Sequence, residues 1–136
     1  LAPDIDMTDM ARLKHFTFYW LPVLVYCLII FIQSSFPATE HIPEFDFSDK
    51  LLHAAVYAVL GMLLYRAFNA MHKRPSTASL LVLSILMTAL YGASDEVHQY
   101  FVPSRSAEFL DFAADTAGGI IGAMVAVVIN KNKPSQ

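Results

Sequence analysis

The segment YGASDEVHQYFVPSRSAEFLDFAADTAGG, residues 91–119, concentrates ionisable side chains between two strongly apolar stretches. A second, smaller polar group opens the apolar stretch that begins near residue 51. Carboxylates, imidazoles and a guanidinium placed together can transfer protons, hold anions or bind cations. The residues that could carry this chemistry are Asp49, Lys50, His53, Asp95, Glu96, His98, Gln99, Arg105, Asp111 and Asp115.

The residue types suggest two roles, catalysis and substrate binding. Imidazole titrates near neutral pH and can act as a general acid or base, while neighbouring carboxylates can orient it or bind a divalent cation. Ammonium and guanidinium groups suit phosphate or carboxylate. The catalytic candidates are His53, Glu96, His98, Asp111 and Asp115. The substrate-binding candidates are Asp49, Lys50, Gln99 and Arg105.

Each candidate also has a structural interpretation. Ser48 or Asp49 fits the N-cap of a helix, and His53 and Tyr57 fit packing at the membrane interface. Asp95 fits a buried ion pair with Lys50 or Arg105 that locks a helix bundle. No Ser-His-Asp arrangement, nucleophile elbow or phosphate loop accompanies these residues. No dense ligand motif favours a metal, so the sequence identifies no cofactor and leaves metal binding open.

The elements that must position these residues are apolar. The chain has 136 residues, of which 56% are hydrophobic and only 15% charged, whereas a soluble domain carries about 25% charged residues. The sequence has four apolar segments: residues 16–36, residues 51–68, a stretch that starts near Ser79, and residues 109–129. The length of each is close to the roughly 20 residues that a helix needs to cross a bilayer. Spanning segments must satisfy their own backbone hydrogen bonds. We therefore predict an all-α bundle of four transmembrane helices with short loops and the lipid bilayer as its surroundings.

The distribution of Lys and Arg predicts the orientation of this bundle. Basic residues lie before the first segment, between the second and third, and after the fourth, while the other two loops are poor in them. Residues 1–15 lack the pattern of a cleavable signal peptide. We expect a cytoplasmic tail at residues 1–15, a membrane domain at 16–130 and a C-terminal tail at 131–136, with both termini inside. The polar ends of three helices then meet at the outer face.

The fourth segment carries a regular row of small residues. Small side chains every four positions let two helices approach closely, and the second segment has small residues within 54–61 to face them. The helix-packing residues are Ala114, Gly118, Gly122 and Ala126. A net charge of −3 and the absence of a Lys/Arg tract exclude nucleic acid as a partner.

The motifs DKLLHAAVYAVLG, DEVHQYFVPSR and LDFAADTAGGIIG together resemble the VanZ-like family of small bacterial membrane proteins. The family pattern has Asp-Lys-x-x-His on one helix, then Glu-x-x-Gln ending in Pro-Gly-Arg, then Asp, Asn and a glycine ridge. It maps, over residues 49–122, onto Asp49, Lys50, His53, Glu96, Gln99, Pro103, Arg105, Asp111, Gly118 and Gly122. Two positions depart: Ser104 replaces the usual Gly, and Asp115 stands where Asn is usual. The second departure adds a carboxylate, which puts an ancestral activity in doubt.

The resemblance implies a bacterial cytoplasmic membrane protein of the cell envelope and a link to glycopeptide resistance, to teicoplanin in particular. Two functions from different classes follow. The polar cluster could bind or process an anionic lipid-linked or envelope substrate, with a lipid headgroup as partner. Alternatively, the chain could be a non-catalytic accessory subunit that packs against a larger respiratory or photosynthetic membrane complex, its polar residues joining the helices. Enzyme and subunit stay open, and a transporter ranks last because the inner halves of the helices are apolar.

Overall fold

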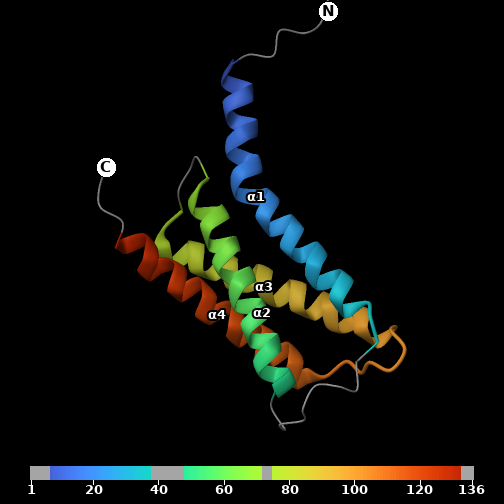
Figure 1. Cartoon of the computed structure of the whole chain (residues 1–136). Helices are drawn as coiled ribbons and strands as arrows, with labels where there is room; N and C mark the ends of the chain where they lie inside the picture. Colours follow the sequence, from blue (N-terminus) through green and yellow to red (C-terminus); the bar gives the residue numbers. More distant parts are fainter. Residues whose placement is uncertain (1–6, 38–47, 72–74, 133–136) are drawn as a thin grey trace, which may run out of the picture.

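The computed structural model describes residues 7–37, 48–71 and 75–132 of the chain. They form four helices, α1 (Met7–Ser34), α2 (Ser48–Asn69), α3 (Thr77–Tyr100) and α4 (Phe109–Lys131) (Figure 1). The described residues contain no strand. Each helix is long and apolar enough to cross a membrane, since even 22 residues rise about 33 Å against a hydrocarbon core of about 30 Å. The predicted all-α fold with four membrane-spanning helices is confirmed.

The first helix is longer than its apolar segment. α1 begins at Met7 and therefore extends into the stretch 1–15 that the sequence assigns to a tail. In Figure 1 its N-terminal part projects beyond the other three helices. Lys73, Arg74 and Lys133, which contribute to the expected orientation, lie outside the described residues.

The most extensive helix contact joins α2 to α4 through their backbones. A Cβ atom on Gly118 would overlap the carbonyl oxygen of Ala54, and one on Gly122 would overlap that of Ala58. The two pairs advance together along both helices, so α2 and α4 run parallel. Figure 1 shows them crossing at the centre of the bundle. Glycine is needed here because any side chain would push the two backbones apart.

The third helix runs antiparallel to α4. Gly119 meets the side chain of Thr88, and Gly92, one turn further along α3, makes room for the carboxylate of Asp115. The hydroxyl groups of Ser84 and Thr88 donate to carbonyl oxygens one turn earlier in their own helix. These buried polar groups are thereby satisfied within an apolar interior.

The first helix covers α2 and α3 and makes no contact with α4 among the described residues. The hydroxyl of Tyr26 donates to the carbonyl oxygen of Val56 at 3.0 Å, and the hydroxyl of Tyr91 donates to that of Cys27 at 2.5 Å. In the most apolar stretch of α1, 11% of the residues are buried inside the bundle, whereas the corresponding share is 33% in α2 and in α4. α1 is thus an outer helix whose surface is left to lipid or to another protein.

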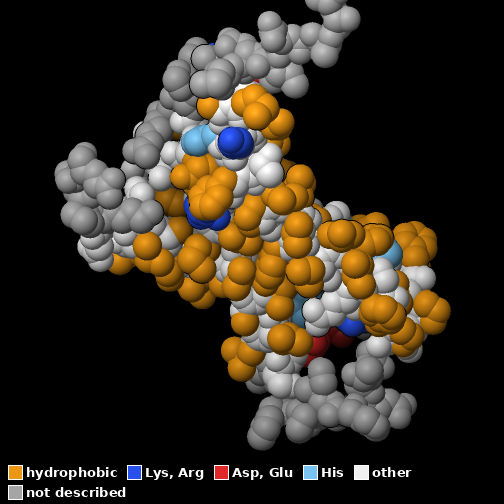
Figure 2. Space-filling model, turned by 45° about the horizontal axis from the view of Figure 1, so that its top comes forward, with side chains coloured by type: hydrophobic (Ala, Val, Ile, Leu, Met, Phe, Trp, Pro, Cys, Tyr) orange, Lys and Arg blue, Asp and Glu red, His pale blue; other side chains and the backbone are white. Residues whose placement is uncertain are grey.

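The outside of the bundle is apolar. Large hydrophobic side chains are exposed on all four helices, among them Leu24, Leu28, Leu51, Leu90, Leu110 and Val128. In Figure 2 such side chains cover most of the visible face, and acidic and basic side chains show in a hollow near one end. A soluble protein rarely exposes so much apolar surface. Such an exterior fits a protein surrounded by the hydrocarbon of a membrane.

Replacing Gly122 by Ala is expected to lower the free energy of unfolding by about 1–3 kcal/mol. The added methyl group would meet the backbone of Ala58 rather than a flexible side chain. Denaturant unfolding in detergent micelles checks this value. Ala117→Val, a small enlargement at an exposed position of the same helix, is the control. Equal stability of the two variants would contradict the close contact of α2 and α4.

Candidate functional site

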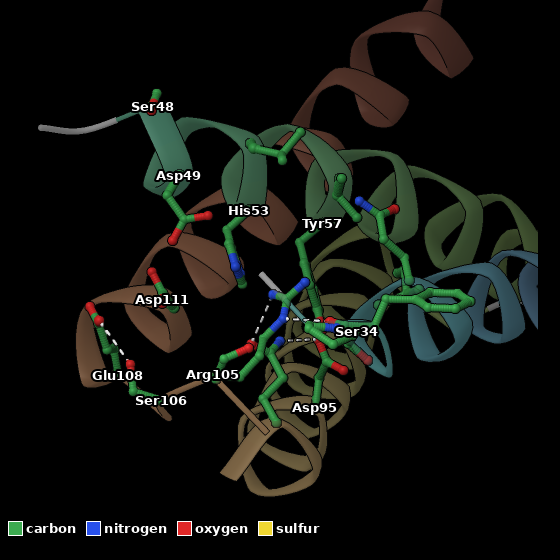
Figure 3. Close-up of a pocket in the computed structure, with 18 residues that line it drawn as sticks. Ser34, Ser48, Asp49, His53, Tyr57, Asp95, Arg105, Ser106, Glu108 and Asp111 are labelled. Atoms are coloured by element: carbon green, nitrogen blue, oxygen red, sulfur yellow. Dashed lines mark hydrogen bonds between the residues drawn. The ribbon is translucent and has the colours of Figure 1, made fainter. Parts of the chain in front are cut away.

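A pocket of about 500 Å³ lies at the end of the bundle where α2 and α4 begin and α1 and α3 end. We call this end the polar end. In the close-up of Figure 3, Asp49, His53 and Tyr57 follow one another along α2, with Asp111 on α4 opposite them. Apolar side chains of α1 and α2 form part of the wall, and the polar lining comprises Gln33, Ser34, Ser48, Asp49, His53, Tyr57, Asp95, Gln99, Ser104, Arg105, Ser106, Glu108 and Asp111.

Lys50 is the cationic centre of the rim. Its Nζ lies 2.5 Å from Asp111 Oδ1, 2.7 Å from Glu108 Oε2 and 3.6 Å from Asp49 Oδ2. The hydrogen bond and the charge of the ammonium lower the pKa of the Glu108 carboxyl. The contribution of this pair to stability is therefore present at neutral pH and is lost as the pH falls through that lowered pKa. One ammonium group thus ties α2 to the start of α4.

His53 and Asp115 form a hydrogen-bonded dyad beneath the rim. His53 Nδ1 lies 2.9 Å from Asp115 Oδ1, and the Asp115 side chain is 0% exposed. An ionised carboxylate only accepts, so in the metal-free dyad Nδ1 carries the proton and Nε2 is the nitrogen left for a substrate. The arrangement fixes the tautomer and the orientation of the imidazole, as a general base or a metal ligand requires.

Glu96 fastens the loop before α4 to α3. Its Oε2 accepts the backbone N–H of Glu108 at 2.8 Å. Within the described part of the chain, its other oxygen, Oε1, is buried without a hydrogen-bond partner, as is Oδ2 of Asp115. Two buried carboxylate oxygens with no donor are unusual, because each loses its hydration on burial.

A chain of hydrogen bonds crosses the floor of the pocket. The Tyr57 hydroxyl donates to Asp95 Oδ2 at 3.2 Å, and Gln99 Nε2 donates to the same oxygen at 3.0 Å. Arg105 then donates to Gln99 Oε1 at 3.3 Å and to the carbonyl oxygen of Phe36 at 3.1 Å. The ion pair of Asp95 with Lys50 or Arg105, considered from the sequence, is replaced by these neutral donors. Arg105 itself has no carboxylate within ion-pair distance among the described residues.

The turn that presents Arg105 has an unusual backbone. Ser104 adopts φ = 62°, the only positive value at a non-glycine residue in the described ranges. This left-handed conformation favours glycine, because a Cβ atom crowds the backbone there. The Gly that the resemblance places at this position has a geometric reason, and Ser104 occupies it under strain.

The structure gathers most of the residues expected at the site. The candidates that lie at the polar end are Asp49, Lys50, His53, Glu96, Gln99, Arg105, Asp111 and Asp115. Of the packing row, Gly118, Gly122 and Ala126 are buried and Ala114 is partly buried.

His98 lies apart from them. Its ring packs against Phe31 at 4.5 Å between centroids, and its Nε2 lies 2.9 Å from Ser35 Oγ. It therefore faces α1 and does not line the pocket.

Glu108 belongs to the ionisable segment 91–119, but it is not among the catalytic or substrate-binding candidates predicted from the sequence. It lies directly before α4, one turn before Asp111, and pairs with Lys50. Glu108 could have been predicted from the sequence, because it lies at the start of a helix and three residues before the candidate Asp111.

Two groups of side chains at the polar end could hold a metal ion. In each, one potential ligand atom per residue lies within 4.8 Å of the others. One group is His53, Glu96 and Asp115, and the other is Asp49, His53 and Asp111. His53 belongs to both, so the two cannot be filled through the same ring nitrogen at once.

Comparison with known proteins identifies one family. A family model described as VanZ/LLP1 matches residues 11–130 and so includes nearly all of the four helices. The match confirms the resemblance that the three motifs indicate. No curated protein and no solved structure matches the chain.

Replacing Lys50 by Met is expected to reduce the free energy of unfolding by about 3 kcal/mol, because it leaves the buried Asp111 carboxylate without a counter-charge. The double variant Lys50→Met with Asp111→Asn should recover part of that loss. Denaturant unfolding of the two single variants and the double variant measures the coupling. Simple additivity of the two substitutions would contradict the ion pair.

Ser104→Gly is expected to stabilise the protein. Removing the Cβ atom relieves about 1–2 kcal/mol of strain from the left-handed conformation. The greater freedom of glycine in the unfolded chain offsets about 0.5–1 kcal/mol of that gain. Thermal unfolding checks the sign. Ala107→Gly, an exposed residue of the same loop without a positive φ, should instead leave the midpoint unchanged or lower it, and the same response in both variants would refute the argument.

Proposed function

The chain belongs to the VanZ/LLP1 family, and we propose that its pocket opens at the outer face of the bacterial cytoplasmic membrane and binds the headgroup of an anionic lipid-linked or cell-envelope molecule. The observation that carries this proposal is the guanidinium of Arg105, which pairs with no carboxylate among the described residues and lies in a pocket that also has apolar walls. Such a pocket can accept a phosphate at its rim while the adjoining lipid tail lies against α1 and α2.

The charge distribution supports the outward orientation. Arg12, Lys14, Arg66 and Lys131 all lie at the end of the bundle opposite the pocket. Basic residues at membrane borders favour the cytoplasmic side, so this end would face the cytoplasm with both termini inside. The pocket would then face the cell envelope, where lipid-linked precursors and phospholipid headgroups are available.

The roles of the basic residues differ. Lys50 is already engaged by Asp111 and Glu108, so its first contribution is to hold α2 and α4 in register. Arg105 is held in place by Phe36 and Gln99 and keeps its charge for a ligand. In this proposal Arg105 binds the phosphate, and Lys50 positions the rim.

The dyad of His53 and Asp115 supplies a proton acceptor if the bound molecule is processed rather than only held. His53 lines the pocket, and its hydrogen bond to Asp115 stabilises the protonated imidazole that base catalysis would form. Hydrolytic or transfer chemistry would need this base beside a bound phosphate ester or acyl group.

A second function has one supporting observation, the exposed surface of α1. With 11% of its most apolar part buried, α1 offers a long apolar face to a neighbouring membrane protein. An accessory subunit of a larger membrane complex would use that face for docking and the polar residues for registry. It would co-purify with its partners at a fixed ratio.

The headgroup proposal is tested with the purified protein in detergent and short-chain lipids. Calorimetric titration should detect dioctanoyl phosphatidic acid and give at least tenfold weaker binding of dioctanoyl phosphatidylcholine, whose phosphate charge is balanced. Arg105→Ala should weaken phosphatidic acid binding at least tenfold, because a charge-assisted bidentate contact is lost. Arg105→Lys, which keeps the charge but not the fork, should fall between them.

Arg12→Ala is the matched control, since Arg12 is exposed at the opposite end. Thermal unfolding of each variant separates loss of binding from loss of fold. Undiminished binding of phosphatidic acid by a folded Arg105→Ala variant would rule out the proposed role of Arg105.

A further inference from the structure

Beneath the headgroup pocket, we propose that His53, Glu96 and Asp115 bind a divalent transition-metal cation. This site does not depend on the proposed headgroup function, because it is argued from buried groups below the rim. It would add a Lewis acid to the chain, next to the surface that Arg105 and Lys50 present.

The first argument is convergence from three helices. His53 comes from α2, Glu96 from α3 and Asp115 from α4, and one potential ligand atom of each lies within 4.8 Å of the others. Ligands of one tetrahedral Zn²⁺, at about 2.0–2.2 Å from the ion, lie roughly 3.5 Å from each other. Small rotations of these side chains, with the ion taking the place of the proton on His53 Nδ1, would bring three ligands to one ion. Helical residues held by the α2–α4 contact supply a rigid frame for it.

The second argument is the state of the two carboxylates. Glu96 is 7% exposed and Asp115 is 0% exposed, and each has one buried oxygen that meets no hydrogen-bond partner among residues 7–37, 48–71 and 75–132. The partnered oxygens are used by the Glu108 N–H and by His53. An unpartnered buried carboxylate oxygen is strongly unfavourable unless it meets a cation or takes up a proton. A bound divalent ion satisfies both oxygens at once.

The third argument is the balance of charge at the polar end. Asp95, Glu96, Asp111 and Asp115 are all buried. Lys50 reaches Asp111, and within the described ranges it makes no ion pair with the other three. Asp95 has two neutral donors. Glu96 and Asp115 are therefore the pair that most needs added positive charge, and two positive charges match two carboxylates.

The same reasoning disfavours the alternative group of Asp49, His53 and Asp111. Lys50 Nζ already lies 2.5 Å from Asp111 and 3.6 Å from Asp49. A metal there would have to displace or repel the ammonium. Asp49 is also exposed, so its carboxylate is hydrated and gains less from an ion.

The donor set selects the kind of cation. One imidazole nitrogen and two carboxylate oxygens suit Zn²⁺ and Mn²⁺, whereas Mg²⁺ prefers oxygen ligands and retains its water. Three protein ligands also leave a position for water or for a ligand oxygen, as in catalytic zinc sites. We expect Zn²⁺ to bind more tightly than Mn²⁺, and Mg²⁺ to bind weakest.

The test uses the full chain, purified in detergent with a tag that contains no histidine and stripped with EDTA. Calorimetric titration with ZnCl₂, MnCl₂ and MgCl₂ should find one Zn²⁺ per chain, in the expected order of affinity. Elemental analysis after dialysis measures retained zinc. The double variant Glu96→Gln with Asp115→Asn should lose at least tenfold in Zn²⁺ affinity, because both charges are removed.

These amides preserve the fold contacts, since Gln and Asn oxygens can still accept from the Glu108 N–H and from His53. The matched control is Asp95→Asn, a buried neighbour of Glu96 outside the metal group, which should bind Zn²⁺ as the parent does. If the double variant aggregates, the two single variants are measured instead, each with an expected tenfold loss.

Two results would overturn the site. In one, the EDTA-treated parent takes up no Zn²⁺ at stoichiometric concentration, as expected if a carboxyl carries a proton instead. In the other, Zn²⁺ binds equally well to the parent and to the folded variants. Loss of phosphatidic acid binding with intact zinc binding would count against the headgroup proposal alone.

Discussion

Gly118 and Gly122 bring the backbone of α4 against the carbonyl oxygens of Ala54 and Ala58, and the register of this contact decides which side chains meet at the polar end. Because α2 and α4 run parallel, the turns before the contact place Lys50 opposite Asp111 and His53 opposite Asp115. A shift by one residue on either helix would separate both pairs. The small residues therefore position the chemistry without taking part in it.

Bringing these side chains together also buries several charged groups at the polar end, which is energetically unfavourable unless each charge is compensated. Four carboxylates are buried near the end of α3 and in the first turns of α4, two helices that can cross a membrane, where an unpaired charge costs several kcal/mol. Three kinds of compensation are present: an ammonium on Asp111, neutral donors on Asp95, and an imidazole on Asp115. One oxygen of Glu96 and one of Asp115 have no such compensation among the described residues. A cation bound to these two oxygens would stabilise the folded protein more than one bound elsewhere at the polar end.

Hydrophobic length and small-residue spacing were enough to predict four helices and their packing row, because both depend on local sequence. The ion pair of Lys50 with Asp111 depends on helix register, which sequence spacing alone does not give. His98 illustrates the limit. At about 100° per residue it lies roughly 160° around α3 from Glu96, so only one of the two can face α4. The sequence did not say which, and the contact with Phe31 places His98 toward α1. Glu108 was given no role because it lies between two of the motifs that carry the family resemblance and falls on no position of either.

The central claim is that the polar end is a binding site rather than only an interhelical lock. Native mass spectrometry of the protein, gently extracted from its own membranes, tests this most directly. The account predicts a monomer or small oligomer that carries an adduct with the mass of a phosphate-bearing lipid or of a divalent cation. Release of the chain only within a larger assembly at fixed ratio, with no such adduct, would contradict it and identify an accessory subunit.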